Sequence, residues 1–265
     1  NKSVESVTWL GNDDSLQPRS RESLDIQNKA TLERNAGNIN DFANSIRAMR
    51  RHEIERIGLA WMSGVIDDEA SLAGMTDVYD AAIEASLQWA IQHRINDIQI
   101  DEAPAAIAII GMGRYGGREV NFSSDADVII IYRPAEGADD DQANLFARKV
   151  QEDLRAILQG PTTFEPKIEL DMDLRPEGKN GPLVRSYASC EEYYRSWAST
   201  WEHQALLRAR YAAGDASLAE DFLMNIADPL RYPKIDLTET QIAEIRKPKA
   251  RMEAERLPRG VRRDR

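Results

Sequence analysis

Two aspartates separated by a single residue, Asp125 and Asp127, are the strongest chemical signal in this sequence. They open an apolar run that indicates a buried strand, so a period of two directs both side chains to one face. Two carboxylates that close together repel each other unless a cation lies between them. Oxygen ligands at this spacing suit Mg²⁺, which keeps several waters and adds the phosphates of a substrate. The pair therefore predicts a magnesium-dependent site.

A glycine-rich turn precedes the pair within residues 105–132, between two apolar runs typical of strands covered on both faces. The spacing Gly111-x-Gly113-x-x-Gly116 is also the dinucleotide-binding fingerprint. In that fold the acid that binds the ribose ends the second strand, whereas here the acids come before it. Arg133, just after the second strand, leaves NADPH binding open, but that alternative gives the aspartates no role.

A second interpretation uses the turn to bind a triphosphate. The backbone amides of Gly113, Gly116 and Gly117 suit phosphate oxygens, and Ser124 lies directly before the aspartate pair. The aspartates would then hold two Mg²⁺ ions, which clamp the attacking and leaving oxygens of an in-line displacement. Ordinary turn formation by Ser-Ser-Asp is the simpler alternative for the pair.

A third carboxylate is expected from residues 166–174, which alternate like a strand. One face of that strand is apolar, and the other carries Glu169, Asp171 and Asp173. Either Asp171 or Asp173 would complete the site, and plain exposure of an edge strand is the alternative. The loop that follows carries Arg175 and Lys179, which are candidates for holding the triphosphate or simple surface cations.

The remaining sequence predicts helices over residues 20–34, 41–61, 66–73, 77–94, 140–158, 190–211, 217–226 and 238–255. We expect an α+β fold with a helical subdomain over 1–100, a catalytic core over 101–186 and a C-terminal helical region over 187–265. The helix over 41–61 carries a basic group, which we interpret as a solvated face or, alternatively, as a docking surface for an acidic partner. Its members are Arg47, Arg50, Arg51 and Arg56.

Composition narrows the class of protein. The 265 residues carry a net charge of −11, with no basic excess that would indicate a nucleic-acid surface. A single cysteine, Cys190, fits a reducing compartment, and no apolar run is long enough for a membrane span. We therefore expect a cytoplasmic protein without nucleic-acid or membrane partners. The sequence starts without Met and stops in a basic stretch, so we expect a piece of a longer chain.

The motifs also carry two resemblances to known families. A Gly-Gly pair, a spacer, Asp-x-Asp opening a strand and a distant third acid resemble the nucleotidyltransferase superfamily that includes DNA polymerase beta. The segments GMGRYGGREVNFSSDADVIIIY, LDMDLRPEGKNGPLVRS and TWEHQALLRARYAAGD resemble the glutamine synthetase adenylyltransferase family over nearly the whole chain. The flanking segments VTWLGNDDSLQPRSRESL and ADPLRYP resemble its C-terminal, adenylylating half in actinobacteria.

The resemblance implies a small mixed sheet with helices, and Mg²⁺-dependent transfer of AMP from ATP to a tyrosine of glutamine synthetase. The other half of such enzymes removes the AMP by phosphorolysis. Asp125, Asp127 and Asp171 match the metal ligands, and Arg175 matches an arginine of the motif, whereas Asp173 replaces another. The family also uses a PII-type nitrogen regulator. Its Gly-Gly-Leu-x-Asp-x-Glu signature is absent, so poor transfer, or a purely nucleotide-binding regulatory module, stays open.

Overall fold

A five-stranded mixed sheet lies at the centre of the structure, a computed structural model that describes residues 13–161, 165–234 and 238–246. The order is β3-β2-β1-β5, and β4 also pairs with β2. Strands β1 (Ala105–Gly111), β2 (Ala126–Pro134) and β5 (Arg210–Gly214) are antiparallel neighbours. The short strands β3 (Leu170–Asp171) and β4 (Val184–Ser186) run parallel to β2. The two buried strands predicted on either side of the glycine turn are confirmed.

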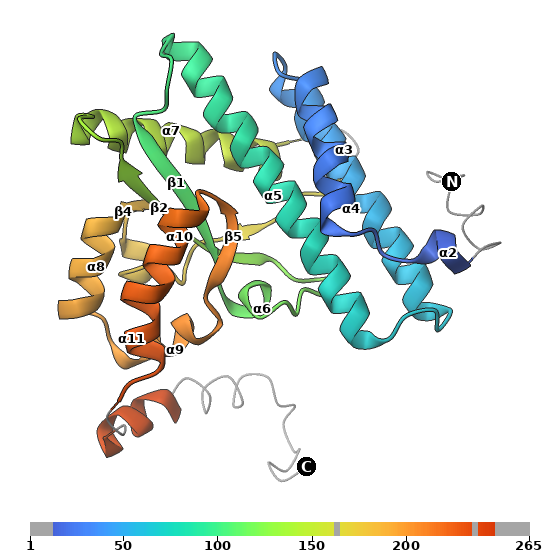
Figure 1. Ribbon diagram of the computed structural model, residues 1–265. Helices are drawn as coiled ribbons and strands as arrows, with labels where there is room; N and C mark the ends of the chain where they lie inside the picture. The colour runs from blue at the N-terminus through green and yellow to red at the C-terminus, as the bar shows by residue number, and fades with distance from the viewer. Residues whose placement is uncertain (1–12, 162–164, 235–237, 247–265) are drawn as a thin grey trace.

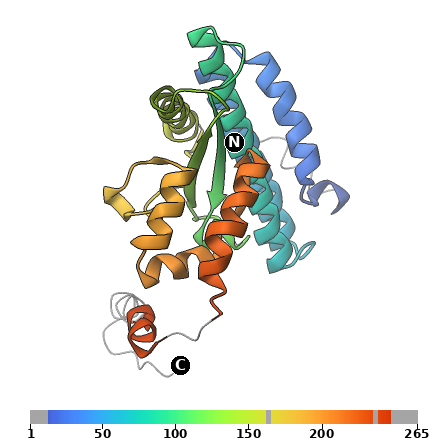
Figure 2. The ribbon, with the colours of Figure 1, turned by 60° about the vertical axis from the view of Figure 1, so that its left-hand side comes forward.

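Helices cover both faces of this sheet (Figures 1 and 2). Alternate side chains of β1 and β2 enter two separate cores because successive residues of a strand point to opposite faces. Ile109 and Ile130 pack with α5 (Asp68–Ile98) and α7 (Asp140–Gln159), whereas Ile110 and Ile129 belong to the second core. That second core includes α8 (Tyr187–Ser196) and α10 (Ala216–Phe222). The α+β class is confirmed.

The N-terminal helices share the first core with the sheet. They are α3 (Arg21–Arg34), α4 (Ile39–Met62) and α5, while the short α2 (Asp13–Leu16) lies against α4. The expectation of two helices over 66–73 and 77–94 is wrong, because α5 runs through both. Gly74 in its interior lets α5 approach its neighbours: a Cβ there would meet Pro18 Cβ at 3.1 Å and Ile57 Cδ1 at 3.3 Å. The glycine serves close packing and ends no helix.

The basic group on α4 is not a solvated face, which corrects the prediction. Arg47 is fully buried and donates to the carbonyls of Ile157 at 2.6 Å and Gly160 at 2.8 Å. Arg50 donates to the Tyr79 hydroxyl at 2.7 Å, and Arg51 lies 2.8 Å from Glu165. Arg56 donates to the carbonyl of Ser15. These four side chains connect α4 to other parts of the fold, so they do not form a docking surface.

The predicted helix over 140–158 is confirmed as α7. Asp139 caps its first turn by accepting from the amide of Gln142 at 2.9 Å, and Gly160 follows its last turn. The strand expected over 166–174 is reduced to Leu170–Asp171. The chain then turns, because the Asp171 carboxylate accepts from the amide of Asp173 at 2.7 Å and Arg175 N donates to the Met172 carbonyl at 3.1 Å. Ile168, Leu170 and Met172 are nevertheless buried, as the alternation predicts.

The single helix expected over 190–211 is also wrong. Helix α8 ends at Ser196, and α9 (Thr200–Ala205) begins after a capping box formed by Ser199 and Glu202. The 3₁₀ turn η2 (Leu206–Arg208) then leads into β5, which pairs with β1. Helix α10 (Ala216–Phe222), the π-helical turn η3 (Leu223–Ala227) and α11 (Asp228–Arg231) follow.

Residues 239–246 are helical, and the rest of the expected helix over 238–255 lies outside the described residues. No helix in the described ranges combines the length and the apolar character that crossing a bilayer requires.

Candidate functional site

Strand pairing brings the three predicted aspartates to one place. Asp125 directly precedes β2, and Asp127 is its second residue, with the buried Ala126 between them. The parallel pairing of β2 with β3 sets Asp171 opposite Asp127. Burial raises the pKa of Asp127 to about 6, and the charges of Asp125, Asp171 and Asp173 act in the same direction. Such a cluster of carboxylates is unfavourable by itself and attracts a cation.

A cavity of about 600 Å³ opens beside these carboxylates. Asp125, Asp171 and Asp173 line it, together with Lys179 and Arg155. Asp127 is half-buried next to the cavity, against the glycine turn. The lining therefore combines acidic and basic side chains, as a site for a metal-bound polyphosphate requires.

The glycine turn positions Asp127. Gly113 has a φ of +54°, and a Cβ at this position would overlap the Asp127 carboxylate. Gly116 has equally little room, because a Cβ there would overlap the carbonyls of Arg208 and Gly111. These two contacts explain why glycine is needed at both positions.

The hydrogen-bond partners of the Gly116 and Gly117 amides differ from those predicted. Residues Gly113–Gly116 form the short helix α6, in which the Gly116 amide donates to the Met112 carbonyl at 2.5 Å. The Gly117 amide donates to the Gly113 carbonyl at 3.1 Å. Both amides are therefore used within the turn, and the expectation that they hold phosphate oxygens is corrected. The turn acts through close packing instead.

The predicted cations divide into two kinds. Arg175 is buried, with 7% of its surface exposed, and donates to the carbonyls of Gly181, Met172 and Lys179 at 2.9, 2.7 and 3.1 Å. These contacts hold the loop. Arg175 also lines the cavity, with its Nη1 3.8 Å from Asp173, so a contact with a triphosphate stays a prediction. The side chain of Lys179 is 82% exposed, and its Nζ lies 3.1 Å from Asp173. Both cations line the cavity, and Lys179 is the more exposed of the two.

Ser124 shapes the turn before β2. Its hydroxyl donates to Asn121 Oδ1 at 3.0 Å and accepts from the Asn121 amide at 3.1 Å. Its carbonyl accepts from the Tyr79 hydroxyl at 3.1 Å. These contacts connect the turn to α5, while the Ser124 side chain still lines the cavity.

Sequence patterns did not reveal several residues at this site. Arg210 on β5 binds the Asp80 carboxylate through two donors, at 2.8 and 2.9 Å, and the Tyr115 carbonyl at 3.1 Å. It thereby fixes the glycine turn to α5. Arg208 lies against Gly117, and its Nη1 donates to Glu119 at 2.5 Å. The only signal in the sequence is the family-like segment around Arg210, whose pattern predicts a helix.

The oxygen atoms of Asp125, Asp127 and Asp171 suit a hard cation as ligands, because they belong to carboxylates that repel one another. Within the described residues, however, no three His, Cys, Asp or Glu side chains are already grouped closely enough to hold a metal ion. The support for a cation therefore comes from the charge at Asp127.

The close contact at Gly113 leads to a prediction. In Gly113→Ala the new methyl group displaces the Asp127 carboxylate, so ATP binding that depends on Mg²⁺ should be lost. The positive φ itself costs about 1 kcal/mol of unfolding free energy. Gly137→Ala is the matched control: its φ is +77°, but no atom lies within 4 Å of the added Cβ. Thermal unfolding should show the cost of the positive φ alone in Gly137→Ala and a larger loss in Gly113→Ala, and calorimetry should show loss of binding in Gly113→Ala alone. Equal ATP binding by the two variants would contradict this role for Gly113.

The amino-acid sequence matches a known protein family over most of its length. The family model for glutamate-ammonia ligase adenylyltransferase matches residues 6–225. The chain belongs to this family. The resemblance stated from the sequence motifs is therefore confirmed, and the mixed sheet is consistent with a polymerase beta-like nucleotidyltransferase fold.

Curated relatives extend the match over the whole chain. A protein of Bifidobacterium longum (strain DJO10A), named bifunctional glutamine synthetase adenylyltransferase/adenylyl-removing enzyme, is 75% identical over 265 residues. The match covers 100% of this chain and 25% of that protein. A protein of the same name from Mycobacterium tuberculosis (strain CDC 1551 / Oshkosh) is 46% identical over 81% of this chain and 21% of its own length. The chain thus spans about a quarter of the length of these relatives, and the actinobacterial resemblance is confirmed.

Proposed function

We propose that this chain carries the site for Mg²⁺-dependent transfer of AMP from ATP to a tyrosine of glutamine synthetase. The observation that supports this most is the pairing of β2 with β3, which sets Asp171 opposite Asp127, together with the raised pKa of Asp127, to which burial and the charges of Asp125, Asp171 and Asp173 contribute. Three carboxylates at the edge of a cavity that also holds Lys179 suit a metal-bound triphosphate. The names of the relatives supply the reaction and the acceptor protein.

The residues of this chain would act mainly by positioning. Asp125, Asp127 and Asp171 would hold two Mg²⁺ ions, which supply charge neutralisation on the phosphates and activation of the acceptor hydroxyl. Lys179 and Arg155 would contact the triphosphate, and Arg175 would keep the loop that carries Lys179 in place. Burial raises the pKa of the Cys190 thiol to about 12, so this cysteine gives no covalent nucleophile. Positioning and electrostatics would therefore provide most of the acceleration.

Removal of AMP from glutamine synthetase is the second candidate, because the relatives' names include an adenylyl-removing activity. The same carboxylates would serve that reaction, with inorganic phosphate attacking the bond between AMP and tyrosine. A PII-type nitrogen regulator would be a further partner under either proposal.

Calorimetric titration tests the site, and labelled transfer tests the direction. We expect ATP to bind only with Mg²⁺ and binding to disappear in Asp125→Asn, while Asp141→Asn, an exposed position at the start of α7, binds normally. In the full-length protein, Asp125→Asn should stop transfer of label from α-³²P-ATP to glutamine synthetase and leave the phosphate-dependent release of the AMP label intact. Loss of phosphate-dependent release with transfer intact would instead favour removal. NADPH binding that is indifferent to Mg²⁺ and to Asp125 would overturn both proposals.

A further inference from the structure

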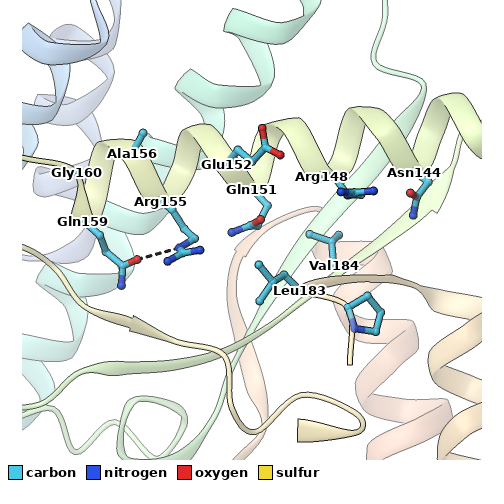
Figure 3. A pocket seen from close by; sticks show the side chains of 11 residues that line it. Asn144, Arg148, Gln151, Glu152, Arg155, Ala156, Gln159, Gly160, Leu183 and Val184 are labelled. Atoms are coloured by element: carbon cyan, nitrogen blue, oxygen red, sulfur yellow. Dashed lines mark hydrogen bonds between the residues drawn. The ribbon is translucent and has the colours of Figure 1, made fainter. Parts of the chain in front are cut away.

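A groove beside the carboxylate cavity has no role in the function proposed above. Its volume is about 770 Å³, and it lies between α7 and residues 182–184 (Figure 3). Arg155 and Leu183 line both this groove and the carboxylate cavity. The two spaces therefore adjoin each other at these two side chains, and the aspartates line only the carboxylate cavity.

The two walls of the groove differ in chemistry. The wall formed by α7 is polar. Its polar side chains recur at intervals of three or four residues, so they share one face of the helix. They are Asn144, Arg148, Gln151, Arg155 and Gln159. The opposite wall is apolar and consists of Pro182, Leu183 and Val184. In Figure 3 Gln151 and Arg155 extend from α7 toward Leu183, so both kinds of surface face the same space.

Gln151 on the floor of the groove has an unused donor. The residue is buried, with 4% of its surface exposed, and its Nε2 has no hydrogen-bond partner in the described structure. Buried polar groups almost always have partners, and an unpaired one is unfavourable. An acceptor oxygen of a bound ligand would satisfy this amide.

The groove is also positively charged in an otherwise acidic chain. Arg148 is exposed and, within the described ranges, forms no hydrogen bond or ion pair with another residue. Arg155 is exposed, and its Nε donates to Gln159 at 3.1 Å. Glu152 also lines the groove, and its carboxylate lies 2.8 Å from Lys149 Nζ and near the charge of Arg148, so the two arginines exceed the acidic charge of the lining by one. Two guanidinium groups beside an unpaired amide suit carboxylates and backbone carbonyls.

We propose that this groove binds an acidic segment of the acceptor protein, next to the tyrosine that receives AMP. This inference rests on the transfer reaction proposed above. The distance along α7 from Asn144 to Gln159 is about 22 Å at 1.5 Å per residue, which matches about seven residues of extended peptide. The described residues that line the groove include no aromatic ring for stacking a nucleotide base. The polypeptide therefore fits better than the adenosine of ATP.

Charge reversal in the full-length protein tests this inference. Arg148→Glu should raise the KM for glutamine synthetase about tenfold, because a favourable pair becomes a like-charge contact. The KM for ATP should not change, and kcat at saturating acceptor should stay normal. Raising the salt concentration should weaken acceptor binding less in this variant than in the wild type. Gln151→Leu should raise the acceptor KM roughly threefold by removing the buried donor, within the range for one hydrogen bond. Arg34→Glu, an exposed position at the end of α3, makes the same charge change and should leave both KM values unchanged.

The outcomes separate this inference from the proposed reaction. An unchanged acceptor KM in Arg148→Glu overturns the inference alone, and a raised KM for ATP reassigns the groove to the nucleotide. If the wild-type protein transfers no AMP, the proposed function fails. Binding of glutamine synthetase measured without ATP still tests the groove in that case. Weaker binding by Arg148→Glu than by Arg34→Glu would support it, and equal binding would overturn it.

Discussion

Replacing Asp127 with asparagine should lower AMP transfer by at least about 10²-fold and, in the absence of metal, make the protein more stable. A decrease in transfer rate of this size is expected when one preorganised electrostatic contact is removed from a reaction site. The gain in stability follows from the pKa of Asp127, which burial and three neighbouring carboxylates raise from 3.8 to about 6. A charged Asp127 is therefore unfavourable in the folded, metal-free protein at neutral pH.

The direction of the pH dependence follows from proton binding. Between about pH 4 and 6 the folded protein holds a proton at Asp127 that the unfolded chain has released, so stability falls as pH rises. Above about pH 6 the charged Asp127 lowers the free energy of unfolding by its full amount, and below about pH 4 this destabilisation disappears. Asparagine carries no charge, so the variant should gain on the order of 1–2 kcal/mol at pH 7 after allowance for solvent screening, and nothing near pH 4.

Urea unfolding with EDTA at pH 4 and pH 7 measures this difference, and labelled transfer measures activity. Asp141→Asn, exposed at the start of α7, is the control and should change neither quantity appreciably. Near-normal transfer by Asp127→Asn would contradict the proposed site. A stability change of equal size at both pH values would contradict the raised pKa. Loss of activity together with gain of stability would show that the cluster serves function at the expense of the fold.

Replacing Arg47 with methionine should destabilise the fold by about 3 kcal/mol, the range for several hydrogen bonds from a buried charged donor. The guanidinium of Arg47 lies at the C-terminal end of α7, where the last carbonyls of a helix have no partner within the helix. It donates to Ile157 and Gly160, and one further contact reaches Ala156 at 3.4 Å. Methionine keeps much of the side-chain volume and leaves these carbonyls without their donor.

Thermal unfolding measures this effect, and a loss of about 3 kcal/mol corresponds to a melting temperature roughly 6–12 °C lower. Arg195→Met makes the same substitution at an exposed position of α8 and should change the melting temperature by no more than about 2 °C. Equal melting temperatures of Arg47→Met and the wild type would show that α7 does not need this contact.

Sequence patterns predicted the parts of the fold that depend on local residues. The apolar runs of β1 and β2 and the amphipathic face of α7 appeared with bounds close to those observed. Asp125 and Asp127 were identified because a period of two along one strand is a local property. Alternation placed both Asp171 and Asp173 on the polar side of their segment, and only the family resemblance selected Asp171. Its position opposite Asp127 depends on strand pairing, which the sequence does not encode locally.

The errors concern contacts between residues far apart in the chain. Arg47 resembles any arginine on an amphipathic helix, and only the end of α7 shows why it is buried. Arg210–Gly214 has small residues and continues a helical pattern, so only β1 makes it a strand. The Gly116 and Gly117 amides look available in the sequence, but the turn closes into α6 and uses them. Tertiary contacts decided the first two cases, and hydrogen bonds within the turn itself decided the third.

The late position of β5 affects the order in which a ribosome can complete the sheet. Strand β1 pairs with β2 soon after both are made, but its other edge pairs with β5, with Ala108 opposite Gly214. At about 5–20 residues per second, the intervening stretch of about 100 residues takes roughly 5–20 s to synthesise. During that time a long apolar edge has no partner, and such edges promote aggregation. The nascent chain therefore passes through a vulnerable interval that ends only when residues 210–214 leave the exit tunnel.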